Sequence, residues 1–362
     1  MYKLLLPLLF SAACFLSGCG ASDTSIESGT SDLDSAVKLM VDNTILPTLQ
    51  SLQSETATLQ NTVESFCTTG NANLTAGNLT TLQAQWHSTN AAWYRLAPFK
   101  FGPLVYGDAY EYIDSYHSRG SDELSAIRSY ITTFLAGTDS ISILANKSGL
   151  PVLEVALFET SNQDTTTLNI VNEYTGNARR CALLTGHTMA LQTHINLISS
   201  QWNTDYRNRG QSYRDMLINQ TLDNEFSAFD DDGDGTTAMG RITLAAQDFF
   251  DLIANHDITS EKDHFSNGKI WNALEESINS IELMLEGQPG DFPNLFDIMK
   301  NNGHNQNIAA VQDNIDTFKT TLEDTDKINL TAISSALDGN FKNAIPDSLN
   351  ISLGLTFTDG DG

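Results

Sequence analysis

Hydrophobic residues recur along most of the chain at the spacing of α-helices that pack against one another. Three stretches place apolar residues, and two histidines, at intervals of three and four, so that each forms a stripe along one helix face. The stripes are Leu184, His187, Leu191, His194 and Ile198; Trp271, Leu274, Ile278, Ile281 and Leu285; and Ile308, Val311, Ile315, Phe318 and Leu322. No alternating run is long enough to indicate a major sheet. The pattern predicts an all-α protein made of helical bundles.

The length of the chain predicts two such domains or one large one. A single hydrophobic core stops growing efficiently beyond roughly 250–300 residues, and the chain has 362. The best boundary is the polar stretch Asn203–Gln211, which contains Gly210. We therefore expect an N-terminal helical domain over residues 32–205 and a C-terminal helical bundle over residues 206–362.

The first residues have the layout of a lipoprotein signal. A short segment with Lys3 precedes an apolar stretch that is too short to span a bilayer, and Leu16-Ser17-Gly18-Cys19 follows. This tetrapeptide resembles a bacterial lipobox, in which the cysteine carries the lipid. Residues 1–18 are then the signal peptide, and residues 19–31, rich in Ser, Thr, Gly and Asp, are expected to be a flexible tether. The alternative is an ordinary cleaved signal.

This signal predicts a bacterial envelope protein held at a membrane face by its acyl chains without spanning the membrane. Gly20 and Ala21 follow the cysteine, which by analogy with envelope lipoproteins favours the outer membrane and its periplasmic face.

The charge of the chain excludes some partners. Lys and Arg number 19 against 45 Asp and Glu, for a formal net charge of −26. Binding to nucleic acid draws on clustered Lys and Arg, and here the basic residues are scattered. Electrostatic attraction to anionic lipid is disfavoured for the same reason. We expect no nucleic-acid partner, and attachment to the membrane through lipid only.

The four cysteines have different expected fates. Cys14 leaves with the signal and Cys19 carries lipid, so Cys67 and Cys181 remain as one pair in an oxidising compartment. We predict a disulfide between them; the alternative is two buried thiols. A single cysteine pair without clustered histidines is not a metal signature.

An acidic stretch in the C-terminal half is similar to a calcium loop. Asp230, Asp232 and Asp234 take the first, third and fifth positions of such a loop, and Thr236 would contribute its carbonyl at the seventh. The twelfth position, normally a bidentate Glu, is Arg241. The sequence therefore leaves two interpretations: a weak calcium site, or an acidic turn between two helices.

Several blocks of the chain, in order, resemble the imelysin-like family. They are Trp86–Trp93 leading to Phe101-Gly102-Pro103; Gly149–Glu154 with Leu157 and Phe158; Arg180-Cys181; and Leu353–Asp361. The resemblance implies a two-domain, all-helical protein of the bacterial periplasm or outer membrane. It also implies a link to iron uptake, or to the metallopeptidase activity after which the family is also classed. The terminal Asp359 and Asp361 belong to a family-like block, which places them near the domain interface.

The chain departs from the hallmark of that family. The family motif Gly-x-His-x-x-Glu is a proposed metal site, because His and Glu three residues apart share one helix face. Here Gly149 and Glu154 are kept, but Pro151 replaces the histidine and has no ligating atom. One interpretation is a structural helix start, with Pro151 in the first turn and Glu154 near the positive end of the helix dipole. The other keeps Glu154 as a ligand whose partners come from elsewhere.

Other catalytic motifs are missing from the sequence. It has no His-Glu-x-x-His and no Gly-x-Ser-x-Gly. His187 and His194 are about 10.5 Å apart along a helix, too far to bind one metal, and we interpret both as core or interface residues.

We therefore predict a non-catalytic imelysin-like binding protein in iron or metal uptake, with Gly149, Glu154, Asp359 and Asp361 as candidate ligand-site residues. Its ligand would be iron or another divalent metal, an iron chelate, or an envelope protein partner. The alternatives are a metallopeptidase and a structural envelope lipoprotein.

Overall fold

The computed structural model describes residues 25–68, 70–114, 123–219, 237–255 and 269–353. Throughout these residues the regular structure is helical and contains no strand, so the all-α prediction is confirmed. Two isolated bridges join Asp114 to Gly149 and Leu144 to Lys147. The candidate residues Cys19, Asp230, Asp232, Asp234, Thr236, Asp359 and Asp361 lie outside the described residues, and their roles stay predictions.

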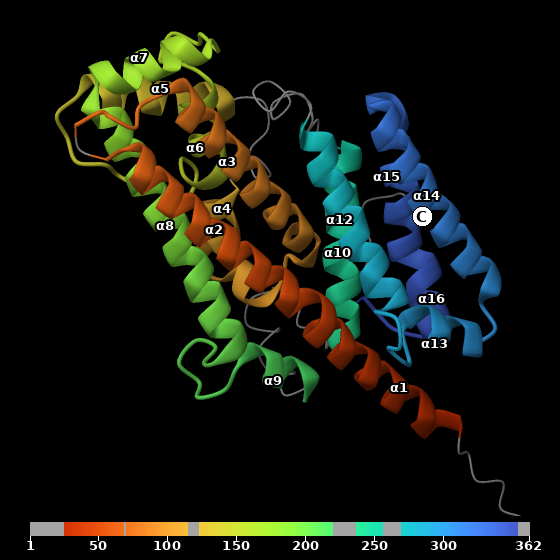
Figure 1. Ribbon diagram of the computed structural model, residues 1–362. Helices are drawn as coiled ribbons and strands as arrows, with labels where there is room; N and C mark the ends of the chain where they lie inside the picture. The colour runs from red at the N-terminus through yellow and green to blue at the C-terminus, as the bar shows by residue number, and fades with distance from the viewer. Residues whose placement is uncertain (1–24, 69, 115–122, 220–236, 256–268, 354–362) are drawn as a thin grey trace, which may run out of the picture.

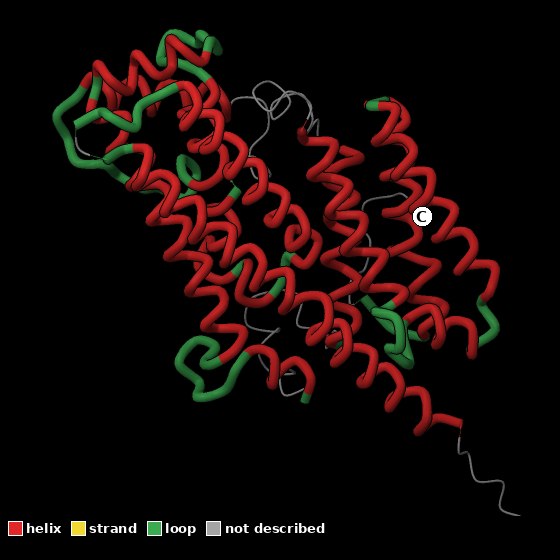
Figure 2. Tube along the Cα trace, in the orientation of Figure 1, coloured by secondary structure: helices red, strands yellow, loops and turns green. Residues whose placement is uncertain are grey.

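The helices of the first part of the chain gather on one side of the molecule (Figures 1 and 2). They are α1 (Ser25–Met40), α2 (Leu46–Phe66), α3 (Ala76–Leu96), α4 (Ala109–Ile113), α5 (Glu123–Ala136), α6 (Gly149–Phe158), α7 (Thr167–Gly176), α8 (Ala178–Asn203) and α9 (Tyr213–Ile218). Short 3₁₀ turns at Ala97–Phe99, Gly102–Leu104 and Tyr106–Asp108 connect α3 to α4. Of these helices only α1 extends away from the group, beneath the helices of the second part.

The second part forms an adjoining group. Its helices are α10 (Ala238–Asn255), α12 (Lys269–Glu286), α13 (Leu295–Asn301), α14 (Asn305–Asp324), α15 (Lys327–Gly339) and α16 (Ile345–Leu349). Here α10 packs on α15, and α14 packs on both α12 and α15.

The predicted stripes are the buried faces of α8, α12 and α14. All five stripe residues of α12 are buried, as are four of the five on α14, with Ile308 partly covered at its start. On α8, His187 is buried together with the aliphatic residues, and His194 is half-buried. The residues that recur at the helical spacing in the sequence are therefore the residues that pack into the core.

The two groups are joined along α3 and α12, which pack against each other. The Ser277 hydroxyl donates a hydrogen bond of 2.5 Å to the carbonyl of Tyr94, and Arg95 forms an ion pair of 2.7 Å with Glu276. The α1 helix adds a second connection, because it contacts α10 and α13. The expected division at residue 205 falls in the loop between α8 and α9, and α9 packs back onto α8. The division into two domains stays a prediction.

Two π-helical turns precede prolines. Val41–Ile45 joins α1 to α2 just before Pro47, and Asn340–Ala344 joins α15 to α16 just before Pro346. A proline inside a helix cannot donate to the carbonyl four residues back, and its ring crowds that carbonyl. A wider turn at this point relieves both problems. As a result α1 and α2 form one nearly continuous rod (Figure 1).

The expected tether is too long. The α1 helix begins at Ser25, so residues 25–31, which we assigned to a flexible tether, are helical. The reason is that Ser and Asp are as favourable at the start of a helix as they are in a linker, so composition alone does not separate the two.

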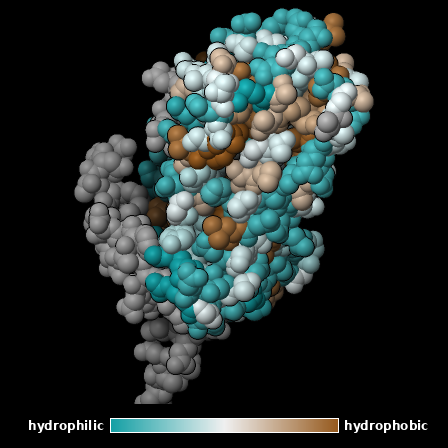
Figure 3. Space-filling model, turned by 90° about the vertical axis from the view of Figure 1, so that its left-hand side faces the viewer, coloured by the Kyte–Doolittle hydropathy of each residue, from teal (hydrophilic) through white to brown (hydrophobic). Residues whose placement is uncertain are grey.

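On the side shown in Figure 3, hydrophobic side chains form small patches separated by hydrophilic ones. No described helix combines the length and the hydrophobicity needed to cross a bilayer.

Cys67 and Cys181 form the predicted disulfide. Cys67 follows the last turn of α2, and Cys181 lies in the first turn of α8, with 5.5 Å between their Cα atoms. Since the two helices pack along each other, the bond fixes an existing contact. It closes a loop with a sequence separation of 114, long enough for a large entropic effect on the unfolded chain.

We predict that replacing Cys67 and Cys181 together by Ala lowers the free energy of unfolding by roughly 2–5 kcal/mol. Urea titration followed by circular dichroism measures this change. Wild-type protein treated with a reductant should unfold at the same urea concentration as the double variant. Equal stability of the oxidised protein and the double variant would contradict the prediction.

Candidate functional site

The family-like motif forms the first two turns of α6, and Gly149 determines how this helix begins. Gly149 has φ of 70° and forms a bridge with Asp114, at the end of α4. A Cβ atom at this position would lie 2.2 Å from the carbonyl oxygen of Ile113 and 2.5 Å from that of Tyr112. Only glycine avoids both the left-handed strain and this contact with the backbone. Gly149 therefore allows α6 to pack directly on α4.

The whole of α6 is buried. Every residue from Gly149 to Phe158 is shielded from solvent, including Pro151 and Glu154. Pro151 is the third residue of the helix, where its missing N–H has no helical acceptor to lose. The Trp86 indole on α3 donates a hydrogen bond of 3.1 Å to the carbonyl of Leu150. The interpretation of Pro151 as part of a helix start is therefore confirmed.

Glu154 lies close to the start of α6 but beyond its first turn. Glu154 is the sixth residue of α6, and the first turn contains no acidic residue. The stabilisation of a carboxylate by the helix dipole falls off within the first turn. The position of Glu154 is therefore set by its tertiary surroundings and not by the end of the helix.

Glu154 belongs to a buried polar cluster with Tyr94, Tyr110 and Asp114, which we call the motif cluster. Tyr94 lies on α3, Tyr110 on α4 and Asp114 directly after α4, and both Asp114 and Glu154 have no exposed surface. Burial raises the pKa of Tyr94 well above its usual value, and the nearby charges of Asp114 and then Glu154 raise it further. Burial and the charge of Asp114 do the same to the pKa of Tyr110.

The motif cluster is fixed by aromatic neighbours. The Trp93 indole donates a hydrogen bond of 2.8 Å to Oδ2 of Asp114 and packs edge-on against the Tyr110 ring, with 4.8 Å between centroids. Lys100 places its ammonium over the same ring, 4.3 Å from the centroid of Tyr110. Both phenols stay protonated at neutral pH, so they supply hydroxyl groups to a site whose charge comes from carboxylates.

The donor set of the motif cluster suits a hard cation. Carboxylate and hydroxyl oxygens are the ligands that such cations prefer, and Asp114 supplies a second buried carboxylate whose charge, like that of Glu154, acts on Tyr94. With Pro151 in place of the histidine, α6 offers no nitrogen ligand beside Glu154. Among the residues that the structure places, no three His, Cys, Asp or Glu side chains come together as a metal site. A cation here would need hydroxyl or carbonyl oxygens to complete its shell.

The two histidines of α8 have structural surroundings, as predicted. Nε2 of His187 is 3.0 Å from the Tyr130 hydroxyl, and burial lowers the pKa of His187 to about 3. The His194 ring stacks on Tyr112, with centroids 4.0 Å apart, and partial burial lowers its pKa. On α3, His87 packs against Trp86 and Phe158, and burial lowers its pKa to about 4.

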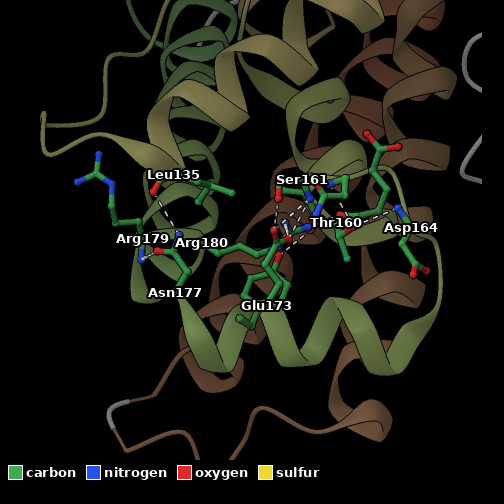
Figure 4. Close-up of polar contacts among 12 residues, drawn as sticks. Leu135, Thr160, Ser161, Asp164, Glu173, Asn177, Arg179 and Arg180 are labelled. Carbon is green, nitrogen blue, oxygen red and sulfur yellow. Dashed lines mark hydrogen bonds and ion pairs between the residues drawn. The ribbon is translucent and has the colours of Figure 1, made fainter.

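The far end of α6 is held by Arg180, which is 1% exposed. Its guanidinium forms an ion pair with Glu173 and donates to the carbonyls of Ala156 and Glu159 (Figure 4). Glu173 in turn accepts hydrogen bonds from Ser161. A buried guanidinium is stable only when its donors are used in this way. Arg180 thus ties α6, α7 and α8 together and orders the chain that follows α6.

Sequence reasoning found Gly149, Glu154 and Arg180 through the family-like blocks, but it missed Tyr94, Tyr110 and Asp114. Tyr94 directly follows the tryptophan that ends the first block, and that adjacency was the only signal. Asp114 joins the site through the bridge to Gly149, which no local pattern predicts. The structure does not test whether Asp359 and Asp361 approach the cluster.

The chain belongs to the imelysin family. The family model described as Imelysin, Peptidase_M75, matches residues 45–348, which confirms the resemblance. A search of curated proteins finds no match.

Two solved structures share the fold. One is an imelysin-like protein from Psychrobacter arcticum 273-4, with a TM-score of 0.60 and 15% identity over 90% of this chain and 98% of that one. The other is a putative iron-regulated protein A precursor from Parabacteroides distasonis ATCC 8503, with a TM-score of 0.58 and 14% identity over 88% of this chain and 95% of that one. At this identity the likeness concerns the fold alone.

The close approach at Gly149 predicts a large effect of substitution. Gly149→Ala should lower the free energy of unfolding by more than about 3 kcal/mol, since backbone strain and a steric clash add. Two control variants separate these causes. Gly210→Ala also has positive φ but open space around it, and should cost about 1 kcal/mol. Gly77→Ala, in open space on α3, should be neutral or stabilising by up to about 1 kcal/mol. Chemical denaturation of the three variants checks this order.

The buried imidazole of His187 predicts a pH dependence. Between about pH 6.5, its value in an unfolded chain, and about pH 3, its folded pKa, the unfolded chain binds a proton that the folded chain does not. Stability should therefore fall as the pH falls, with His187 contributing up to about 1.4 kcal/mol per pH unit. Unfolding free energies measured from pH 7 to pH 5 give this slope.

His187→Gln should reduce that slope, leaving the contribution of His87 and other groups. Tyr130→Phe removes the hydrogen bond but keeps the imidazole, so it should lower stability and retain the slope. An unchanged slope in His187→Gln would contradict the assignment.

Proposed function

We propose that this protein is a non-catalytic, lipid-anchored binding protein of the bacterial envelope that takes part in iron or metal uptake. In this proposal the motif cluster is the cation site, with Glu154 and Asp114 as charged ligands. The observation that carries it is a second fully buried carboxylate, Asp114, whose charge acts on Tyr94 as that of the motif residue Glu154 does. Membership of the imelysin family supports an envelope-associated protein.

The proposed link to iron draws on the printed name of one structural neighbour, an iron-regulated protein A precursor. The net charge of −26 supports a cation as the ligand, because a field of one sign raises the local concentration of counter-ions. The expected lipid on Cys19 would keep that field at the membrane face. The same proposal includes an iron chelate, which would bring the metal to the protein. It also includes an envelope protein partner, which would deliver the metal or receive it.

Replacement of the motif histidine favours binding over hydrolysis. Metal-assisted hydrolysis needs a firmly held metal with an open position for water. Pro151 removes one ligand from α6, and complete burial of Glu154 and Asp114 restricts the approach of a polypeptide to both carboxylates. The family designation as a peptidase group keeps a metallopeptidase as the rival function.

We predict that the metal-free mature protein binds one divalent cation per chain and that Glu154→Gln abolishes this binding. The probes are Fe²⁺ under anaerobic conditions, Mn²⁺ and Zn²⁺, followed by calorimetry and by metal analysis after dialysis. A bound cation should also raise the melting temperature, and at a hundredfold excess over Kd it stabilises the folded state by about 2.7 kcal/mol. Asp114→Asn should have the same effect as Glu154→Gln.

Two control variants locate the site. Glu282→Gln changes an ion-paired carboxylate on the surface of α12 and should leave binding intact. Asp232→Asn changes the calcium-like stretch, so loss of binding in this variant alone would place the cation there and overturn the assignment to the motif cluster.

The rival function is tested on the same samples. Incubation of the metal-loaded protein with an unfolded polypeptide should give no cleavage. Cleavage that stops with a chelator and is absent in Glu154→Gln would replace the binding proposal with a peptidase. Absence of binding for every metal would leave a structural envelope lipoprotein.

A further inference from the structure

A polar groove lies between α5 and the chain that follows α6, away from the motif cluster. Its volume is about 360 Å³, and hydroxyl groups dominate its lining. Ser125, Ser129, Thr132 and Thr133 come from α5, and Ser161 and Gln163 come from the loop. The four residues of α5 recur at the helical spacing, so they share one face of that helix. Ligand sites in proteins begin at about 300 Å³, so the groove is large enough for a small ligand.

The hydroxyl groups on α5 are available to a ligand. Threonines on other exposed helix faces, such as Thr58, Thr193 and Thr317, donate to the carbonyl four residues back. The side-chain hydroxyls of Ser125, Ser129, Thr132 and Thr133 make no such bond, nor any other within the described part of the chain. Each can therefore both donate and accept a hydrogen bond toward the groove.

Among the described residues that line the groove, Arg128 is the only charged one, and it is paired with Glu159. Arg128 donates to both carboxylate oxygens of Glu159, at 2.8 and 3.0 Å. The Glu159 side chain is 2% exposed and that of Arg128 is 21% exposed. A cation would find the carboxylate occupied, and an anion would have to compete with it for the guanidinium. The lining is thus electrically balanced, which favours a neutral ligand.

The loop side of the groove is held in place before any ligand arrives. Arg180 holds the carbonyl of Glu159, and Glu173 accepts hydrogen bonds from Ser161 (Figure 4). The Thr160 hydroxyl accepts hydrogen bonds from the backbone N–H of Asn162 and Asp164, at 3.3 and 3.0 Å. A site fixed in this way loses little conformational entropy on binding.

We propose that this groove binds a neutral polyhydroxyl ligand, a monosaccharide or one sugar unit of a glycan. The chemistry of the ligand mirrors that of the lining, because each sugar hydroxyl donates one hydrogen bond and accepts others, as serine and threonine do. The amide of Gln163 adds a planar donor and acceptor. This site is separate from the proposed cation site, and its ligand is of a different class.

The test uses saturation-transfer NMR on the folded mature protein with glucose, galactose, mannose and N-acetylglucosamine, each at millimolar concentration. At least one sugar should show saturable transfer. The double variant Ser129→Ala/Thr133→Val removes two hydroxyls from the groove and should weaken that binding by about tenfold or more. Circular dichroism confirms that the helical content is unchanged.

The matched control is Ser54→Ala/Thr58→Val, which makes the same changes four residues apart on exposed positions of α2, and should bind as the wild type does. Glu154→Gln should also leave sugar binding unchanged, so this proposal and the cation proposal fail separately. The inference is overturned if no sugar shows transfer, if both double variants weaken binding equally, or if only inorganic phosphate binds.

Discussion

The burial of α6 on every side is the constraint on which the rest of this structure depends. A helix in the centre of a bundle must be apolar all round, and α6 meets this condition at nine of its ten positions. Neighbours can surround it closely because Gly149 lets its first residue approach the end of α4. Arg180 satisfies carbonyls at its other end. The two residues fix the helix at opposite ends, so its side chains have little freedom to shift.

Because α6 is buried on every side, Glu154 is a carboxylate held away from water. A carboxylate at the one polar position of a buried helix has a desolvation cost of several kcal/mol unless nearby groups offset it. Asp114 is a second fully buried carboxylate, and the charges of both residues raise the pKa of the Tyr94 phenol. In the function proposed above, a bound cation would offset part of this cost.

The sequence predicts the fold well, for a physical reason. Stripes such as Trp271 to Leu285 arise because one face of each helix must be apolar, and that requirement is local enough to be read from spacing. The disulfide was predictable because Cys14 was assigned to the signal peptide and Cys19 to lipid attachment. Only Cys67 and Cys181 were then left to form a pair. The start of α1 could not be predicted from the sequence, because a helix start and a flexible linker use the same small polar residues.

The candidate site was only partly predictable. Gly149 and Glu154 lie in one short block, but Asp114 and Tyr110 approach them through a bridge and a helix contact formed by the folded chain. The sequence left two interpretations of Glu154, a residue near the helix start or a ligand, because the burial of the whole of α6 is a property of its neighbours. Sequence spacing predicts where a helix forms, but it does not predict which distant residues will pack around it.

The disulfide has a consequence for proteolysis. The covalent loop between Cys67 and Cys181 encloses α3 to α7, and therefore the whole motif cluster and the hydroxyl-lined groove. A single peptide-bond cut anywhere inside that loop leaves two pieces still linked through sulfur and packed by the same core. The part of the chain that contains α3 to α7 can therefore be cut once by a protease without losing a fragment.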